Sequence, residues 1–333
     1  MSSAALVIQT AFLGDVVLST PLLSALAERH GAVDVVTTPL AAPLLETLAV
    51  VRKVFPYDKR GADRGWRGLR SLARRLQEQG YAQAYLPHRS LRSAALAMLA
   101  RIPDRIGFSG GWSFLYTEAR PKPRTGHEND RLLALANGAP GVYRPQLRPT
   151  AEDQQVAADM IDGDFVALAP GSIWGSKRWP YYAELAAALS AKTGIVVIGG
   201  RDDAALGEEI VRAVEGGRGR AAVNACGKLT LRQSAALIGK ARLLVTNDSA
   251  PLHLATAMGS PVVALFGPTV TEFGFGPLGA GDVSLGVQGL DCRPCSPHGP
   301  PACPLRHHRC MRELTVAAVL AAIEGLGALR PRN

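Results

Sequence analysis

The chain has 333 residues, of which 47% are hydrophobic and 20% are charged. This composition is that of a globular protein of about two domains, and it excludes a disordered or low-complexity chain. Lys and Arg outnumber Asp and Glu by 37 to 28, a formal net charge of +9. That balance favours an anionic partner, which can be a nucleic acid, an acidic membrane surface or a phosphorylated substrate.

The first half alternates short apolar runs with stretches of helical periodicity. Residues 4–27 are apolar enough to suggest a membrane span, but Asp15 near the centre and the interruptions at Gly14 and Pro21 favour a strand followed by a helix. A charged region typical of a secretory signal is missing from MSSAALVIQT, so we expect a cytoplasmic protein. The patterns predict strands at residues 6–9, 33–37, 53–57 and 81–86, and helices at 16–29, 40–48, 66–79 and 90–101.

The second half repeats this alternation. Strands are predicted at residues 165–169, 195–199, 222–225, 243–245 and 262–266, and helices at 181–191, 204–214, 231–240, 252–258 and 316–326. Residues 140–149 contain three prolines and lack periodicity, which indicates a linker. We therefore expect an α/β protein of two Rossmann-like, doubly wound domains, residues 1–145 and 150–333, facing a central cleft.

The turn TAFLGD, residues 10–15, follows the first predicted strand. Gly14 permits a tight turn, and Asp15 lies at the amino end of the next helix. Asp15 can cap that helix, or it can act as a general base that takes a proton from an acceptor hydroxyl.

Two further loops after predicted strands can hold an anion or a sugar. In APGSIWGSKRWP, residues 169–180, small residues including Ser172 precede Lys177, an arrangement that suits a diphosphate, although a plain basic loop is the alternative. In the string GGRDD, residues 199–203, Asp202 can bind ribose hydroxyls, or else Asp202 or Asp203 caps a helix.

Residues 245–268 are the most informative stretch, with the pattern strand, polar turn, helix, glycine and strand. In parallel sheets such turns lie at the carboxyl ends of the strands, where ligands bind. Asp248 and Ser249 can therefore bind a ligand at the amino end of the following helix, or they can only cap that helix.

Basic residues gather before and along the predicted helix 66–79 and after the next strand. Such a run is often a solvated face, but its place beside strand ends also suits contacts with phosphate or carboxylate groups. Trp66 is the only aromatic residue among them, which gives little support to a nucleic-acid stacking surface.

Four cysteines cluster near the C-terminal end, with the spacing Cys292-x2-Cys295-x7-Cys303-x6-Cys310. They can hold a structural Zn²⁺ ion, or remain reduced or transiently oxidised thiols, because a disulfide framework is disfavoured in the cytoplasm.

Taken together, several segments resemble the ADP-heptose:lipopolysaccharide heptosyltransferases of glycosyltransferase family 9, particularly the heptosyltransferase II branch. The resemblance extends over nearly the whole chain. It rests on LGDVVLSTPLL, FPYDKRG, HRSLRSA, APGSIWGSKRWP, TNDSAPLHLATAMGSPVVALFGPT and the tail CRPC…CP…HHRCM.

The resemblance implies a GT-B architecture and a role for each matching residue. Asp15 matches the catalytic aspartate and Lys177 the lysine on the donor diphosphate, with Ser172 in the accompanying loop. Asp248, Ser249, Ala250 and His253 match the element that binds the sugar and phosphates of the donor. An acidic inner-core saccharide would enter beside five arginines, which are Arg60, Arg64, Arg67, Arg89 and Arg92. The chain departs from the expected pattern at His88, where the resemblance implies Asn or Gln in many relatives.

The implied activity is an inverting transfer of heptose from ADP-L-glycero-D-manno-heptose to the lipopolysaccharide inner core, without a catalytic metal or other cofactor. The protein would work at the cytoplasmic face of the inner membrane, held there by charge, and would bind no nucleic acid. Three alternatives remain: a family 9 transferase for another nucleotide sugar of O-antigen or capsule, a GT-B-like epimerase of a nucleotide sugar, and a basic nucleic-acid-binding protein with a zinc module.

Overall fold

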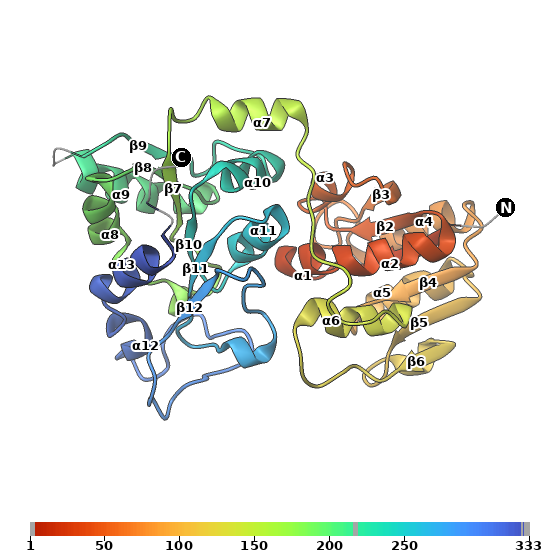
Figure 1. Cartoon of the computed structure of the whole chain (residues 1–333). Coiled ribbons are helices and arrows are strands. Elements are labelled where there is room, and N and C mark those ends of the chain that lie inside the picture. Colours follow the sequence, from red (N-terminus) through yellow and green to blue (C-terminus); the bar gives the residue numbers. More distant parts are fainter. Residues whose placement is uncertain (1–3, 216–218, 328, 330–333) are drawn as a thin grey trace. The chain divides into compact units, whose positions relative to one another are not determined.

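A computed structural model describes residues 4–215, 219–327 and 329. The chain divides into two compact units, Met1–Arg148 and Pro149–Asn333. Within the described residues, each unit contains one six-stranded sheet in which every neighbouring pair of strands is parallel (Figure 1). None of the helices in these residues has both the length and the apolar character needed to cross a membrane.

The first unit begins with its central strand. Its strands are β1 (Ala5–Ile8), β2 (Val33–Thr37), β3 (Val51–Pro56), β4 (Gln83–Leu86), β5 (Asp104–Phe108) and β6 (Glu118–Arg120). Its helices are α1 (Leu13–Leu18), α2 (Thr20–His30), α3 (Ala42–Leu45), α4 (Gly65–Gln77), α5 (Leu91–Leu99) and α6 (Glu128–Leu133), with the 3₁₀ turns η1 (Ser113–Leu115) and η2 (Ala134–Ala136).

The strand order of this sheet is β3-β2-β1-β4-β5-β6. The chain moves from β1 to one edge and then returns past β1 to build the other half, as in doubly wound folds. The direction reverses between β1 and β4, so the loops after these two strands diverge there and leave room for a ligand at the carboxyl ends.

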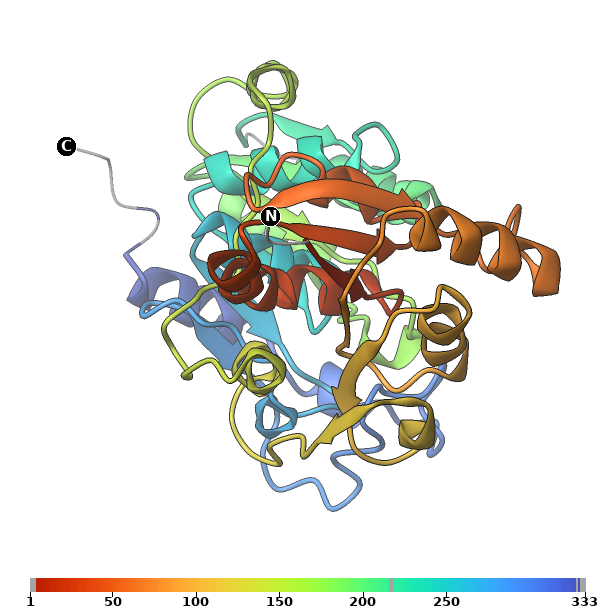
Figure 2. The same cartoon turned by 90° about the vertical axis from the view of Figure 1, so that its right-hand side faces the viewer.

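Alternating side chains of β1 place helices on both faces of this sheet. Leu6 and Ile8 belong to the apolar cluster that α4 and α5 cover, whereas Ala5 and Val7 belong to the cluster that α2 covers. Successive strand residues point to opposite faces, so a run buried throughout requires a helix layer on each side. Figure 2 shows α4 and α5 together on one side of this sheet.

The second unit repeats the design. Its strands are β7 (Phe165–Ala169), β8 (Gly194–Val197), β9 (Ala222–Asn224), β10 (Leu244–Asn247), β11 (Val262–Leu265) and β12 (Val283–Leu285). Its helices are α7 (Ala151–Ala158), α8 (Tyr182–Ser190), α9 (Ala204–Glu215), α10 (Leu231–Lys240), α11 (Ala250–Met258), α12 (Arg309–Arg312) and α13 (Val316–Gly325), with the 3₁₀ turns η3 (Gly175–Lys177), η4 (Arg201–Asp203) and η5 (Thr271–Phe273).

This sheet has the order β12-β11-β10-β7-β8-β9, so its reversal lies between β7 and β10. The loops that leave these two strands carry Lys177 and Asp248, respectively. The topology therefore brings together two sequence elements that are far apart along the chain.

The structure confirms the predicted alternation of strands and helices and adds elements that the patterns did not indicate. Strands β5, β6 and β12 and helices α6 and α7 were not predicted. The expected helix 16–29 is divided into α1 and α2 at Ser19, whose hydroxyl donates to Val16 O at 2.7 Å. The expected helix 40–48 is only the four-residue α3.

Candidate functional site

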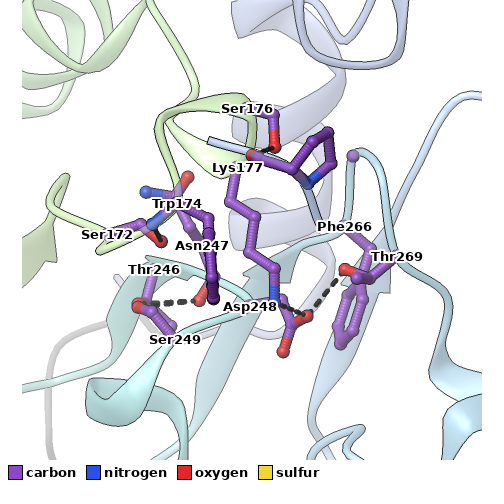
Figure 3. Close-up of polar contacts among 12 residues, drawn as sticks. Ser172, Trp174, Ser176, Lys177, Thr246, Asn247, Asp248, Ser249, Phe266 and Thr269 are labelled. Atoms are coloured by element: carbon purple, nitrogen blue, oxygen red, sulfur yellow. Dashed lines mark hydrogen bonds and ion pairs between the residues drawn. The ribbon is translucent and has the colours of Figure 1, made fainter. Parts of the chain in front are cut away.

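A buried ion pair lies at the reversal point of the second sheet (Figure 3). Lys177 Nζ is 2.6 Å from Asp248 Oδ2, and the two side chains are only 9% and 10% exposed. Lys177 ends the turn η3, and Asp248 follows β10 directly. A charged pair with so little access to water stabilises the fold only when its geometry and its further hydrogen bonds are good.

Thr269 supplies such a further bond. Its Oγ1 donates to the same Asp248 Oδ2 at 2.6 Å, from the loop that follows β11. The loops after β7 and β11 therefore both donate to one carboxylate oxygen, which belongs to the loop after β10 (Figure 3). Thr269 was not among the predicted site residues, although it ends the matching motif of residues 246–269.

Asn247 joins the loops that carry this pair. It is fully buried, its Nδ2 donates to Pro170 O at 2.8 Å, and its Oδ1 accepts from Trp179 N at 3.1 Å. The amide therefore bonds both ends of the segment that contains Lys177. An amide serves here because it presents a donor and an acceptor at once.

The helix α11 begins beside Asp248. Ser249 is its N-cap residue, but within the described chain its side chain makes no capping hydrogen bond, and its hydroxyl lies 3.3 Å from Asn247 O. Ser249 therefore occupies the capping position without a side-chain capping hydrogen bond, and its predicted contact with a ligand stays a prediction. Ala250 is the first helical residue, and His253 is buried one turn later with its ring edge-on to Phe275. The first-turn N–H groups and the helix dipole make this end suitable for a phosphate.

Ser172 and Asp202 have different surroundings. Ser172 is buried in the loop after β7, where its Oγ accepts from Trp174 N at 3.2 Å. Asp202 is exposed in η4. The acidic residue that accepts a backbone hydrogen bond there is Asp203, from Gly200 N at 2.9 Å, so the capping alternative applies to Asp203.

In the first unit, Asp15 lies in the first turn of α1, as predicted. Its Oδ2 accepts from Phe12 N at 3.2 Å, and the side chain is half-buried. Asp15, the third residue of α1, thus accepts a hydrogen bond from the N-cap residue Phe12. This contact does not test the predicted role of Asp15 as a general base.

A polar cluster lies next to this loop. Lys59 Nζ donates to Thr10 O at 2.7 Å, and His88 Nε2 lies 3.5 Å from Thr10 Oγ1 and 3.2 Å from Ser93 Oγ. Burial, followed by the charge of Lys59, lowers the pKa of His88 to about 4, so the ring is neutral at pH 7. A neutral imidazole offers one donor and one acceptor, and an Asn or Gln amide likewise offers both.

The five predicted arginines divide into two groups. Arg92 is engaged with its own unit, because its Nε donates to the Tyr57 hydroxyl and its Nη2 to Asp63 O at 2.9 Å and Gly65 O at 3.0 Å. It therefore ties down the segment before α4. The other four are exposed, and they are Arg60, Arg64, Arg67 and Arg89.

All five cysteines are free thiols. Cys292 Sγ lies 4.0 Å from His307 Nε2, and burial, followed by the neighbouring cysteines, raises the pKa of Cys310 to about 11. Across the described residues, no three His, Cys, Asp or Glu side chains are grouped so that they could hold a metal ion. The zinc site considered for Cys292, Cys295, Cys303 and Cys310 therefore gains no support from this arrangement.

Sequence comparison finds a matching family model and named relatives of this chain. Residues 69–302, well over half of the chain, match the model of glycosyltransferase family 9 (heptosyltransferase). The lipopolysaccharide heptosyltransferase 2 of Salmonella typhimurium is 29% identical over 291 residues, which cover 80% of this chain and 84% of the relative.

Solved structures agree with this family and show the fold. The ADP-heptose LPS heptosyltransferase II of E. coli superposes with a TM-score of 0.78 at 26% identity, covering 97% of this chain and 98% of the other. A family 9 glycosyltransferase from Veillonella parvula gives a TM-score of 0.84 at 23% identity, covering 99% and 98%. The two parallel-sheet units thus form the GT-B type of fold expected from the sequence.

Proposed function

The chain belongs to glycosyltransferase family 9, and from this premise we propose that it transfers heptose from ADP-L-glycero-D-manno-heptose to the lipopolysaccharide inner core, as the second heptose. The observation that carries the proposal is the buried Lys177–Asp248–Thr269 group at the reversal point of the second sheet. The names of the curated relatives and of a similar structure supply the donor and the acceptor.

The second unit, as residues 150–333, would bind the nucleotide sugar. Lys177 and the amino end of α11, from Ser249 and Ala250 onward, would face the diphosphate, because both offer positive charge. Asp248 would hold Lys177 through Oδ2 and accept a sugar hydroxyl through Oδ1. The remaining donor contacts would come from the loops at this edge and from α11, through Ser172, Asp202 and His253.

The first unit, as residues 1–145, would bind the acceptor. Its four exposed arginines would contact carboxylate or phosphate groups of the inner core. Arg92 would hold the segment before α4 through its bonds to Asp63 O and Gly65 O. These groups lie at the membrane, so we place the enzyme at the cytoplasmic face of the inner membrane as a peripheral protein.

The chemistry would be one inverting displacement. Asp15 removes the proton from the acceptor hydroxyl, and that oxygen forms a bond to the anomeric carbon on the face opposite the diphosphate. The bond between the anomeric carbon and the diphosphate oxygen breaks, and ADP leaves with the electron pair. Lys177 stabilises the charge that develops on ADP, which is the role that we assign to it in place of a metal ion.

An ADP-release assay tests this proposal. The purified enzyme receives ADP-heptose with no acceptor, with a heptose-free inner core, or with an inner core that carries one heptose. ADP release with the one-heptose acceptor alone supports the proposal. Release with the heptose-free acceptor alone changes the assignment to the first heptose. If the enzyme turns over only a different nucleotide sugar, the assigned donor changes from ADP-heptose to a sugar nucleotide of O-antigen or capsule assembly.

A further inference from the structure

The cysteine-rich segment after β12 contacts the donor site, and the proposed function gives this segment no role. It runs from Cys292 to Cys310 and lies in the second unit, against the two loops that carry Lys177 and Thr269. We call it the tail segment.

On the Thr269 side, one arginine holds the loop that follows β11. Arg293 donates from Nε to Gly267 O at 2.7 Å, and from Nη2 to Phe266 O and Thr269 O, each at 3.1 Å. Cys295 N donates to Pro268 O at 2.8 Å. Four successive carbonyls, from Phe266 to Thr269, therefore all accept hydrogen bonds from Arg293 and Cys295.

Further features of the surroundings fit the guanidinium of Arg293. Its Nη1 donates to a further carbonyl, Val287 O, at 2.8 Å. A Cβ on Gly286 would lie only 2.4 Å from the Arg293 guanidinium, so glycine leaves the space that the group occupies. Burial lowers the pKa of Arg293, and its hydrogen-bond partners are neutral backbone carbonyls. The rigid fork of the partly buried guanidinium lets Arg293 donate to several carbonyls at once.

On the Lys177 side, the tail segment holds the turn η3. His308 Nε2 donates to Ser176 O at 2.7 Å, and the Ser176 hydroxyl donates to Pro300 O. Gly299 approaches so closely that a Cβ there would lie 3.2 Å from Cε of Lys177. The tail segment thus packs closely against the side chain that carries the ammonium.

We propose that Arg293 and His308 are positioning residues of the donor site, which act through the Phe266–Thr269 loop and the Ser176–Lys177 turn. Both would fix the ammonium of Lys177 and the hydroxyl of Thr269 on Asp248 before the donor arrives. Preorganised charge of this kind needs little rearrangement during the reaction. The inference rests on the proposed function for its link to a nucleotide diphosphate, but the positioning itself can be measured without any ligand.

The test is amine acetylation of the intact protein, read out by peptide mass spectrometry. Lys192, whose side chain is 58% exposed, serves as the internal reference for Lys177, whose side chain is 9% exposed. In Arg293→Lys, a lysine cannot make the four carbonyl bonds, so Lys177 should react at least about tenfold faster relative to Lys192, the scale of a lost bond to a charged group. The affinity for ADP should fall by a similar factor.

Arg105→Lys is the matched control. Arg105 also donates to carbonyls, those of Leu115 at 2.9 Å, Ile102 at 2.7 Å and Pro103 at 3.1 Å, but it lies in the first unit. Its replacement should leave both the Lys177 reactivity and ADP affinity unchanged, which separates positioning from general loss of stability.

A second pair of variants keeps the test decisive if Arg293→Lys fails to fold. His308→Gln retains a donor for Ser176 O and should protect Lys177, whereas His308→Ala should not. Unchanged Lys177 reactivity in folded Arg293→Lys, or equal reactivity in both His308 variants, would overturn the proposal. If the parent shows the expected protection pattern but binds no ADP, the positioning role stands and the ADP-heptose assignment fails.

Discussion

Lys177 Nζ and Asp248 Oδ2 lie 2.6 Å apart at the reversal point of the second sheet, and each side chain is about nine-tenths buried. The two residues are 71 positions apart in the sequence and come from different loops. Their pairing brings the two family motifs together, because Lys177 of one motif donates to the carboxylate of Asp248 in the other.

Replacing Lys177 should damage stability as well as activity. Lys177→Met leaves Asp248 buried without its counter-charge, which should lower the free energy of unfolding by about 3 kcal/mol. Denaturation with urea measures this loss. The double variant Lys177→Met/Asp248→Leu should recover part of the stability but none of the ADP binding. A single variant as stable as the parent would show that the pair contributes little to folding.

The hydroxyl of Thr269 should matter for catalysis out of proportion to its size. Thr269→Val keeps the shape of the side chain but removes the bond to Asp248, so kcat/KM for the donor should fall by about 10- to 100-fold. The matched control is Thr256→Val, because Thr256 donates to Leu252 O at 3.1 Å inside α11. Equal kinetics in the two variants would remove Thr269 from the site.

Asp15 should affect turnover and leave donor binding intact. Asp15→Asn retains an oxygen that can accept from Phe12 N, so α1 should keep its start, but an amide cannot take up a proton. We expect kcat to fall by about 10²- to 10⁴-fold. Calorimetric titration with ADP should give the parent affinity. A variant with near-parent turnover would exclude Asp15 as the base.

His88 should make stability depend on pH. Its folded pKa of about 4 is below the ordinary histidine value of 6.5, so the unfolded chain binds the proton more readily. The contribution is complete above pH 6.5 and is lost as pH falls towards 4, by up to roughly 3 kcal/mol. Urea denaturation at several pH values checks this.

The control for that measurement is His88→Gln, whose amide does not titrate but can still bond to Thr10 and Ser93. Its stability should fall less steeply between pH 6.5 and 4 than that of the parent. The same slope in both proteins would mean that other groups cause the acid sensitivity.

Much of the fold could be predicted from apolar runs, because buried parallel strands leave a continuous signal. The strands that escaped prediction lack that signal. Strand β5 begins with Asp104 and Arg105 and contains a glycine, and β12 has only three residues. Helix α7 is polar, and its clearest sequence sign is the capping pair of Thr150 and Asp153.

The sequence singles out candidate site residues one by one, but it does not predict how they are arranged. Lys177 and Asp248 stood out because each follows a strand and matches a motif. Asn247 and Arg293 did not, since their partners are backbone carbonyls and amides of distant loops, and such partners leave no pattern in the sequence. The bond of Arg92 to the segment before α4 could not be predicted for the same reason.

The most direct test of the account is the mass of the acceptor after reaction. The enzyme is incubated with ADP-heptose and an inner-core acceptor that carries one heptose, and the saccharide is analysed by mass spectrometry. We predict a product heavier by one heptose unit, which is absent with Lys177→Met and strongly reduced with Asp15→Asn. An acceptor of unchanged mass, with a parent enzyme that transfers only another sugar, would contradict the central claim.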